Sequence, residues 1–78
     1  MELHLERALH FAKYNGNPNP EKQIMEQAWP NTNSRGRRQN LTNVINGKTE
    51  PKWSLILIWS DVCKCSLNFI RYGQDKKI

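Results

Sequence analysis

Two polar, asparagine-rich stretches that contain proline limit the fold of this chain more than any other feature. They occupy residues 15–20 and 30–36. Proline interrupts regular structure and asparagine favours turns, so each stretch is predicted to be a turn between two elements. A chain of 78 residues has room for one small domain, so the segments that these turns separate must share one core.

The segments before and between the turns carry apolar residues at helical spacing. Within residues 2–14 these are Leu5, Ala8, Leu9 and Ala12. In the next segment Pro20 suits the first helical position, Ile24 and Ala28 share one face, and Pro30 stops the helix. We therefore expect two short amphipathic helices ahead of residue 30.

A third helix is expected over residues 37–46, because three apolar residues fall on one of its faces: Leu41, Val44 and Ile45. Gly47 then supplies the left-handed residue with which many helices end.

Residues 53–62 fit two structures. Their apolar residues have helical spacing, but the run Trp-Ser-Leu-Ile-Leu-Ile-Trp is also typical of a buried strand. Pro51 as a first-turn residue and Thr49 as a cap favour the helix. Ser66 can cap a last short helix bearing Leu67, Phe69 and Ile70. The prediction is an all-α fold, a small bundle of four to five helices.

The composition predicts a thin stability margin. Hydrophobic residues make up 37% of the chain, and a domain of this size buries only about 60 to 65% of its unfolded surface. Association with a second copy would add buried area, so a homodimer is expected. Its contacts are predicted near four large apolar residues: Trp53, Trp59, Phe69 and Ile70.

Two features predict a cytoplasmic protein without membrane contact. Cys63 and Cys65 are too close together and too few for a secreted disulfide framework. The longest apolar run, Leu55 to Trp59, has five residues, whereas a transmembrane helix needs about 20.

Basic residues are concentrated in one segment. Residues 35–52 contain five bases and one acid and so contribute +4 of the chain's net charge of +5. Such a concentration favours polyanionic partners such as nucleic acid. For any charge run taken alone, a solvated polar face is the alternative.

The predicted helix in this basic segment has the side chains that base reading requires. Its polar face carries Arg38, Gln39, Thr42 and Asn43. Arginine can bind guanine with two hydrogen bonds, and glutamine or asparagine can do the same with adenine. Just beyond the helix, the residues suited to phosphate oxygens are Lys48, Thr49 and Lys52.

Residues 39–51, Gln-Asn-Leu-Thr-Asn-Val-Ile-Asn-Gly-Lys-Thr-Glu-Pro, resemble the second half of the lambda-repressor-like (Cro/C1, XRE-type) helix-turn-helix domain. They are followed by Leu55, Ile58, the two cysteines and the run Ser-Leu-Asn-Phe-Ile at residues 66–70. The shared pattern is a recognition helix that ends in Asn-Gly-Lys, a proline, an apolar helix and a closing Ser-Leu-x-x-Leu helix. The resemblance covers residues 37–70.

The resemblance implies a helix-turn-helix bundle whose third helix enters the major groove, usually from a symmetric dimer. The function would be sequence-specific binding of double-stranded DNA by a transcriptional regulator, a repressor of prokaryotic or phage type, without a cofactor. Matched by position, the base-reading residues would be Arg38, Gln39 and Asn43, with flanking contacts from Asn40 and Thr42. Phosphate contacts would come from Asn46, Gly47, Lys48 and Lys52, and core positions would be Leu41, Val44, Leu55, Ile58 and Leu67.

The chain departs from the family before this helix, where residues 30–36 enlarge a turn that is normally tight. The enlarged turn is either a basic loop, from which Arg35 and Arg37 reach the DNA backbone, or a knob that binds a protein. One domain is expected over residues 1–72, followed by a flexible tail at 73–78.

Other functions have less support. Cys63 and Cys65 are too few for structural zinc, and His4 and His10 lie far from them, so no metal site is expected. No nucleophile or second acid accompanies the histidines, so we expect no enzyme activity. The alternative function is a protein-interaction module on the same fold, such as an antitoxin or a phage inhibitor of a host or defence protein.

Overall fold

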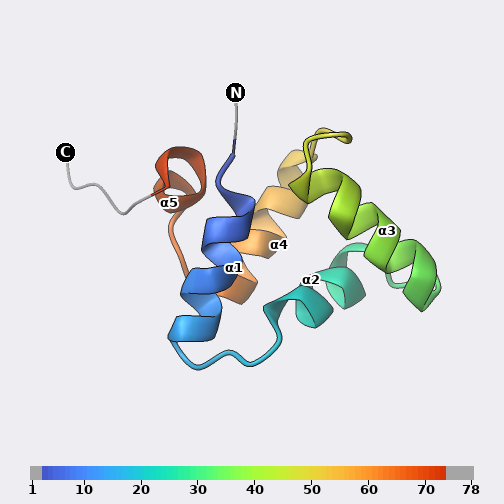
Figure 1. The fold of residues 1–78 in the computed structure, drawn as a ribbon, viewed down its shortest axis with the longest axis horizontal. Coiled ribbons are helices and arrows are strands. Elements are labelled where there is room, and N and C mark those ends of the chain that lie inside the picture. Colours follow the sequence, from blue (N-terminus) through green and yellow to red (C-terminus); the bar gives the residue numbers. More distant parts are fainter. Residues whose placement is uncertain (1–2, 74–78) are drawn as a thin grey trace.

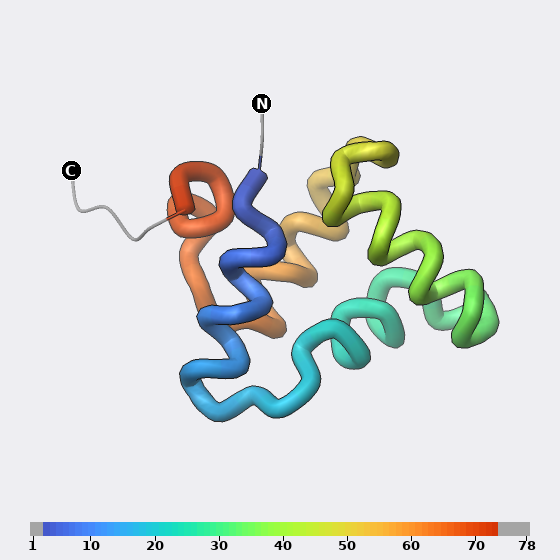
Figure 2. Tube along the Cα trace, viewed as in Figure 1, coloured from blue at the N-terminus to red at the C-terminus, as the bar shows by residue number. Residues whose placement is uncertain are grey.

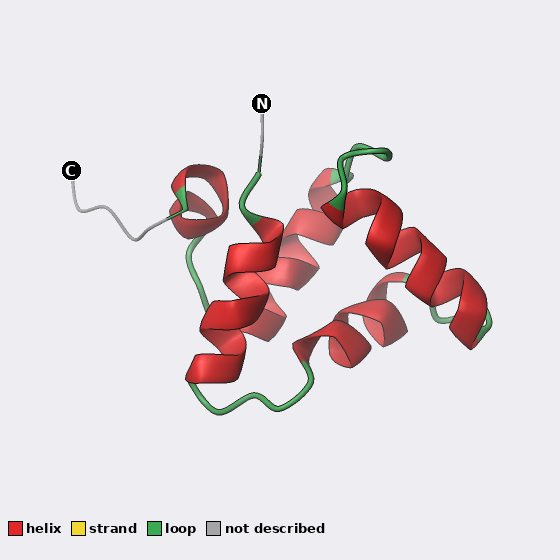
Figure 3. Cartoon of the chain, in the orientation of Figure 1, coloured by secondary structure: helices red, strands yellow, loops and turns green. Residues whose placement is uncertain are grey.

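The computed structural model describes residues 3–73, and in that range the chain forms five α-helices and no strand (Figures 1 and 3). The helices are α1 (Leu5–Tyr14), α2 (Pro20–Ala28), α3 (Ser34–Ile45), α4 (Trp53–Cys63) and α5 (Leu67–Tyr72). The all-α prediction is confirmed. The segment that fitted both a helix and a strand is α4, whose buried residues are Leu55, Trp59, Val62 and Cys63.

Helix α4 is the central element of the bundle. It packs against α1, α2 and α5, whereas α3 packs chiefly against α2. In Figure 1, α3 lies at one end of the molecule and α5 lies at the other. Figure 2 shows the start of α1 beside α5, where the His4 amide donates a hydrogen bond of 2.7 Å to the carbonyl of Ile70. Helix α3 therefore has the least contact with the rest of the fold.

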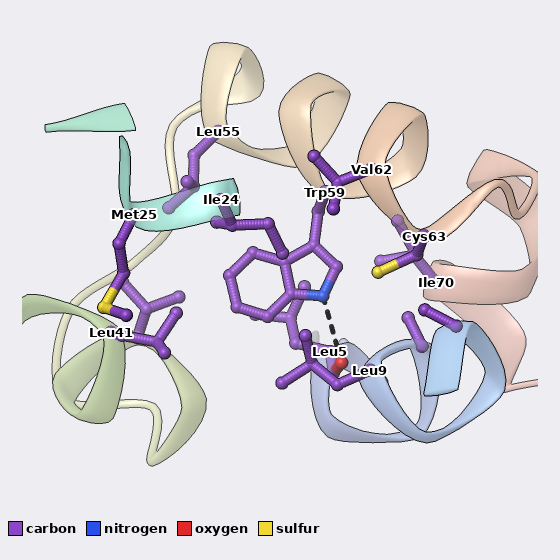
Figure 4. Packing of buried hydrophobic residues seen from close by; sticks show 13 residues of the cluster. Leu5, Leu9, Ile24, Met25, Leu41, Leu55, Trp59, Val62, Cys63 and Ile70 are labelled. Carbon is purple, nitrogen blue, oxygen red and sulfur yellow. Dashed lines mark hydrogen bonds between the residues drawn. The ribbon is translucent and has the colours of Figure 1, made fainter. Parts of the chain in front are cut away.

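The core is centred on Trp59, whose side chain is fully buried. Around it pack apolar residues from all five helices, among them Leu5, Leu9, Ile24, Leu41 and Ile70 (Figure 4). The indole Nε1–H donates a hydrogen bond of 3.0 Å to the carbonyl of Leu5. The polar atom of this large side chain is thus satisfied within an apolar environment, as burial of a tryptophan requires.

Several predicted helix ends are confirmed. Pro20 is at the start of α2, where the Asn19 side chain accepts a hydrogen bond from the Lys22 amide. Ser66 caps α5 by accepting from the Phe69 amide. Gly47 follows α3 with a φ of 77°, in the left-handed region that glycine occupies without strain.

One predicted helix start and the start signals predicted for another helix are wrong. Helix α3 begins at Ser34 rather than at residue 37, because Asn33 caps it with a hydrogen bond of 2.7 Å from the Gly36 amide. The enlarged turn predicted at residues 30–36 is therefore shorter and spans residues 29–33. Helix α4 begins at Trp53 after Lys52, so neither Thr49 as a cap nor Pro51 in the first turn is correct.

The start of the first helix and the start of the tail also differ from the predictions. Helix α1 begins at Leu5 rather than at residue 2, and residues 1–2 lie outside the described range. Gly73, predicted to begin the flexible tail, is buried; its amide bonds the Phe69 carbonyl at 2.7 Å. Its own carbonyl accepts from Arg7 Nη1 at 2.8 Å. The rest of the predicted tail, residues 74–78, lies outside the described residues.

One core position implied by the resemblance is wrong. Leu67 is 37% exposed, because the short helix α5 turns Ile70 and Phe69 towards the bundle instead. The ring of Phe69 packs on the ring of Phe11 with centroids 4.8 Å apart. The remaining core positions, Leu41, Val44, Leu55 and Ile58, are buried or packed against the core.

Candidate nucleic-acid interface

Helix α3 has one buried face and one exposed face. Leu41 and Val44 are buried in the core, while the opposite side chains are exposed: Arg35, Arg38, Gln39 and Thr42. Positions three and four apart lie on the same side of a helix, so these four side chains form a continuous stripe along α3. We call them the α3 stripe. Of the polar face predicted for this helix, Arg38, Gln39 and Thr42 are thus exposed, whereas Asn43 is only half-exposed.

Two asparagines border the α3 stripe. Asn40 and Asn43 are half-buried, between the exposed and the buried faces. Gln39 Nε2 donates a hydrogen bond of 3.1 Å to Asn43 Oδ1. These two residues, both predicted to read bases, are therefore joined to each other on the surface of one helix.

Arg37 stabilises the turn between α2 and α3. It is half-buried, and its Nε and Nη2 atoms donate hydrogen bonds of 2.9 Å to the Trp29 carbonyl and 3.0 Å to the Pro30 carbonyl. The Trp29 carbonyl, at the residue that follows α2, also accepts from the Thr32 amide at 3.2 Å, so the turn is held by both side-chain and backbone hydrogen bonds. Its guanidinium is held against the protein backbone, whereas Arg35 and Arg38 project from the exposed face.

The turn after α3 is closed by backbone hydrogen bonds. The Gly47 amide bonds the Val44 carbonyl at 3.2 Å, and the Lys48 amide bonds the Asn43 carbonyl at 2.8 Å, the pair of bonds that defines a Schellman motif. The Thr49 amide also bonds the Asn43 carbonyl. Gly47 therefore contributes the shape of the turn, and an anion here would meet exposed side chains, those of Asn46, Lys48 and Thr49.

The first turn of α3 gathers positive charge. It contains Arg35 and Arg37 and no acidic residue, although the amino end of a helix already carries a partial positive charge. Each cation there costs stability, typically about 0.3–1 kcal/mol for exposed groups, unless an anion is bound. Within residues 3–73, none of the basic residues at 35–52 takes part in an ion pair. This end of α3 is suited chemically to a polyanion.

Glu21 in α2 lies within the field of Arg38 from α3. Burial raises the pKa of its carboxyl, but a backbone hydrogen bond, Lys13 and the charge of Arg38 together lower it below the ordinary value of 4.5. Glu21 Oε2 lies 3.1 Å from Lys13 Nζ, in an ion pair that joins α1 to α2. Glu21 is therefore an anion at neutral pH, and its pairing with Lys13 leaves Arg38 outside any ion pair among the described residues.

The cysteines pack as small residues at the end of α4. Cys63 is buried and Cys65 is half-buried. A hydrogen bond with the Cys65 thiol, together with burial, raises the pKa of the Cys63 thiol. Cys63 is therefore a protonated thiol at neutral pH, which is a weak nucleophile and a weak metal ligand. Residues 3–73 contain no group of three or more histidine, cysteine or acidic side chains able to hold a metal.

The residues predicted for a dimer contact are only partly accessible. Trp59 and Ile70 are buried in the core and Phe69 is half-buried, so of the four only Trp53 is well exposed, at 60%. Leu57, one helical turn after Trp53 and 45% exposed, is an apolar neighbour that the sequence analysis missed. The i, i+4 spacing of the two residues was the signal that could have identified it.

None of the helices that the structure describes is both long enough and apolar enough to span a membrane. No protein-family model matches this chain, and no match is found among curated proteins or solved structures. The helix-turn-helix resemblance consequently rests on the motif in residues 37–70.

Proposed function

We propose that this chain binds double-stranded DNA and reads its sequence with the α3 stripe, as a transcriptional regulator of the lambda-repressor-like type. The observation that carries the proposal is the position of α3. It packs chiefly on α2, at one end of the molecule (Figure 1), and exposes Arg35, Arg38, Gln39 and Thr42 along one side. A helix exposed in this way has the shape to enter a major groove about 12 Å wide.

Two sets of side chains have different roles in this proposal. Lys48 and Lys52, beyond the end of α3, attract phosphates and so bind every sequence. Arg38, Gln39 and Asn43 contact base edges, and each two-bond contact contributes about 1–3 kcal/mol of discrimination. Charge brings the protein to DNA, and the amide and guanidinium groups of α3 then select the site.

The alternative function, a protein-interaction module, depended on an enlarged turn that could act as a knob. The turn at residues 29–33 is instead compact, and Arg37 binds it through two carbonyls. Arg35 belongs to α3 and is exposed beside the α3 stripe. The shorter turn and the position of Arg35 both favour DNA binding over the protein-binding role.

Single substitutions test the proposed division of roles. Gln39→Ala should reduce affinity for the preferred duplex about tenfold and leave affinity for random duplexes nearly unchanged, because base contacts carry specificity. Arg38→Ala should reduce affinity for the preferred duplex by a larger factor than affinity for random duplexes, which also falls because a positive charge is lost. Lys48→Gln should weaken binding to both duplexes by a similar factor. Competition binding at fixed salt measures both affinities, and circular dichroism verifies folding.

Lys64→Gln is the matched control, because it removes the same charge from an exposed residue at the opposite end of α4 from Lys52. It should change both affinities much less than Lys48→Gln. Equal losses on preferred and random duplexes for Arg38→Ala, Gln39→Ala and Lys48→Gln would reject the assigned roles.

A further inference from the structure

The hydrogen bond between Gln39 and Asn43 leaves two of their side-chain atoms without a protein partner among the described residues. The two residues lie one turn apart on α3, and Gln39 Nε2 donates to Asn43 Oδ1 at 3.1 Å. Within residues 3–73 no other protein group bonds Gln39 Oε1 or Asn43 Nδ2. Gln39 is exposed, and Asn43 Nδ2 is not among the buried atoms without a partner, so both atoms have access to solvent.

These two atoms are an acceptor and a donor. Each side-chain amide has one oxygen and one NH₂ group, so a bond between two amides always leaves one oxygen on one residue and an NH₂ on the other. The remaining set is therefore the same whichever amide donates. Free side chains would have to be ordered at the moment of binding, whereas this bond restricts both beforehand.

In the major groove only adenine offers the complement on a single base. Its N6 amino group donates and its N7 accepts, whereas guanine presents two acceptors, cytosine one donor, and thymine one acceptor beside a methyl group. We propose that Gln39 and Asn43 act as one amide pair that selects adenine, with Gln39 Oε1 accepting from N6 and Asn43 Nδ2 donating to N7. This inference rests on the proposed DNA-binding function.

The test begins with duplexes selected by the full chain from a random library. An adenine is expected at one position of the selected site. Replacing it with 7-deaza-adenine, which lacks the N7 acceptor, should weaken binding about tenfold, or ~1.4 kcal/mol. Purine at the same position lacks the N6 amino group and should cause a similar loss.

Asn43→Asp then identifies the group that contacts N7. Aspartate keeps the shape and the Oδ1 acceptor for Gln39 but has no NH₂ group. Its added charge lowers affinity for all DNA, so the informative quantity is the ratio of affinities for the adenine and the 7-deaza-adenine duplexes. This ratio should fall from about ten in the wild type to about one, as expected for two coupled partners.

Ser34→Asp is the charge-matched control, because it adds the same charge at an exposed position outside the pair. It should keep the ratio near ten. A pair that only stabilised α3 would give a lower Tm for Asn43→Asp with an unchanged ratio, and that result would overturn the inference, as would a selected site without adenine at any position. Both outcomes leave the proposed DNA binding intact, whereas failure to select any sequence overturns the binding proposal and the inference together.

Discussion

Trp59 is the residue on which the packing of this small domain depends most. It is fully buried, and its indole N–H reaches the Leu5 carbonyl of α1. Trp53, on the same helix, is 60% exposed. Six positions in an α-helix correspond to about 600° of rotation, so the two side chains point to different sides of α4. Composition alone does not show which tryptophan is buried, but the position of each residue around the helix axis does.

Trp59→Phe should lower the free energy of unfolding by about 2 kcal/mol, because it removes a buried hydrogen bond and leaves space in the core. Trp53→Phe, the same replacement at an exposed position, should change it by less than about 0.5 kcal/mol. Urea denaturation followed by circular dichroism measures both. Similar losses for the two variants would mean that Trp59 is not the centre of the core.

Helix α3 is the element whose sequence signals conflict. Start signals in sequences are a capping residue followed by acids in the first turn, but here Asn33 is followed by Arg35 and Arg37. The start was expected at residue 37 because the polar, proline-containing stretch at residues 30–36 was predicted to be a turn. The proposed function explains this conflict. Cations at the amino end of α3 lower the intrinsic stability of the helix, but they favour the binding of phosphate groups there.

Substitutions of the Asn33 cap test that explanation. Asn33→Ala removes the hydrogen bond to the Gly36 amide and should cost about 1 kcal/mol of stability. Asn33→Asp keeps a capping oxygen and adds a charge that favours the helix, so the Tm should be unchanged or higher. Its affinity for every duplex should nevertheless fall, because the carboxylate repels phosphates. Tighter DNA binding by Asn33→Asp would contradict the anion-binding role of this end of α3.

At the scale of the whole molecule, the sequence predicts where single helices lie along the chain but not the contacts that one helix makes with another. Apolar spacing predicted the first three helices and most of the core, whereas by spacing alone residues 53–62 fitted both a helix and a strand. It did not predict the hydrogen bond from Arg37 to the Trp29 carbonyl or the one from Arg7 to the Gly73 carbonyl. Both bonds depend on how separate elements are placed in the tertiary structure. The exposure of Leu67 likewise follows from how α5 lies against α1 and α4.

The candidate site was predictable for a related reason. Its residues lie within one helix and the turn that follows, so helical spacing alone brings Arg38, Gln39 and Thr42 to one side. The backbone hydrogen bonds that close the Gly47 turn could not be predicted, because residue types do not show which amides are bonded.

The homodimer stays a prediction. Its expected contact surface is now limited to the exposed Trp53 and Leu57. Sedimentation equilibrium would measure the oligomeric state.

Sequence reading by α3 is tested by measuring the affinity of the wild-type chain for a selected duplex and for a scrambled duplex of equal length, each at two salt concentrations. A helix that reads bases should bind the selected duplex at least about 10³-fold more tightly, and both affinities should fall as salt rises. Equal affinity for the two duplexes, or binding that does not change with salt, would contradict this prediction.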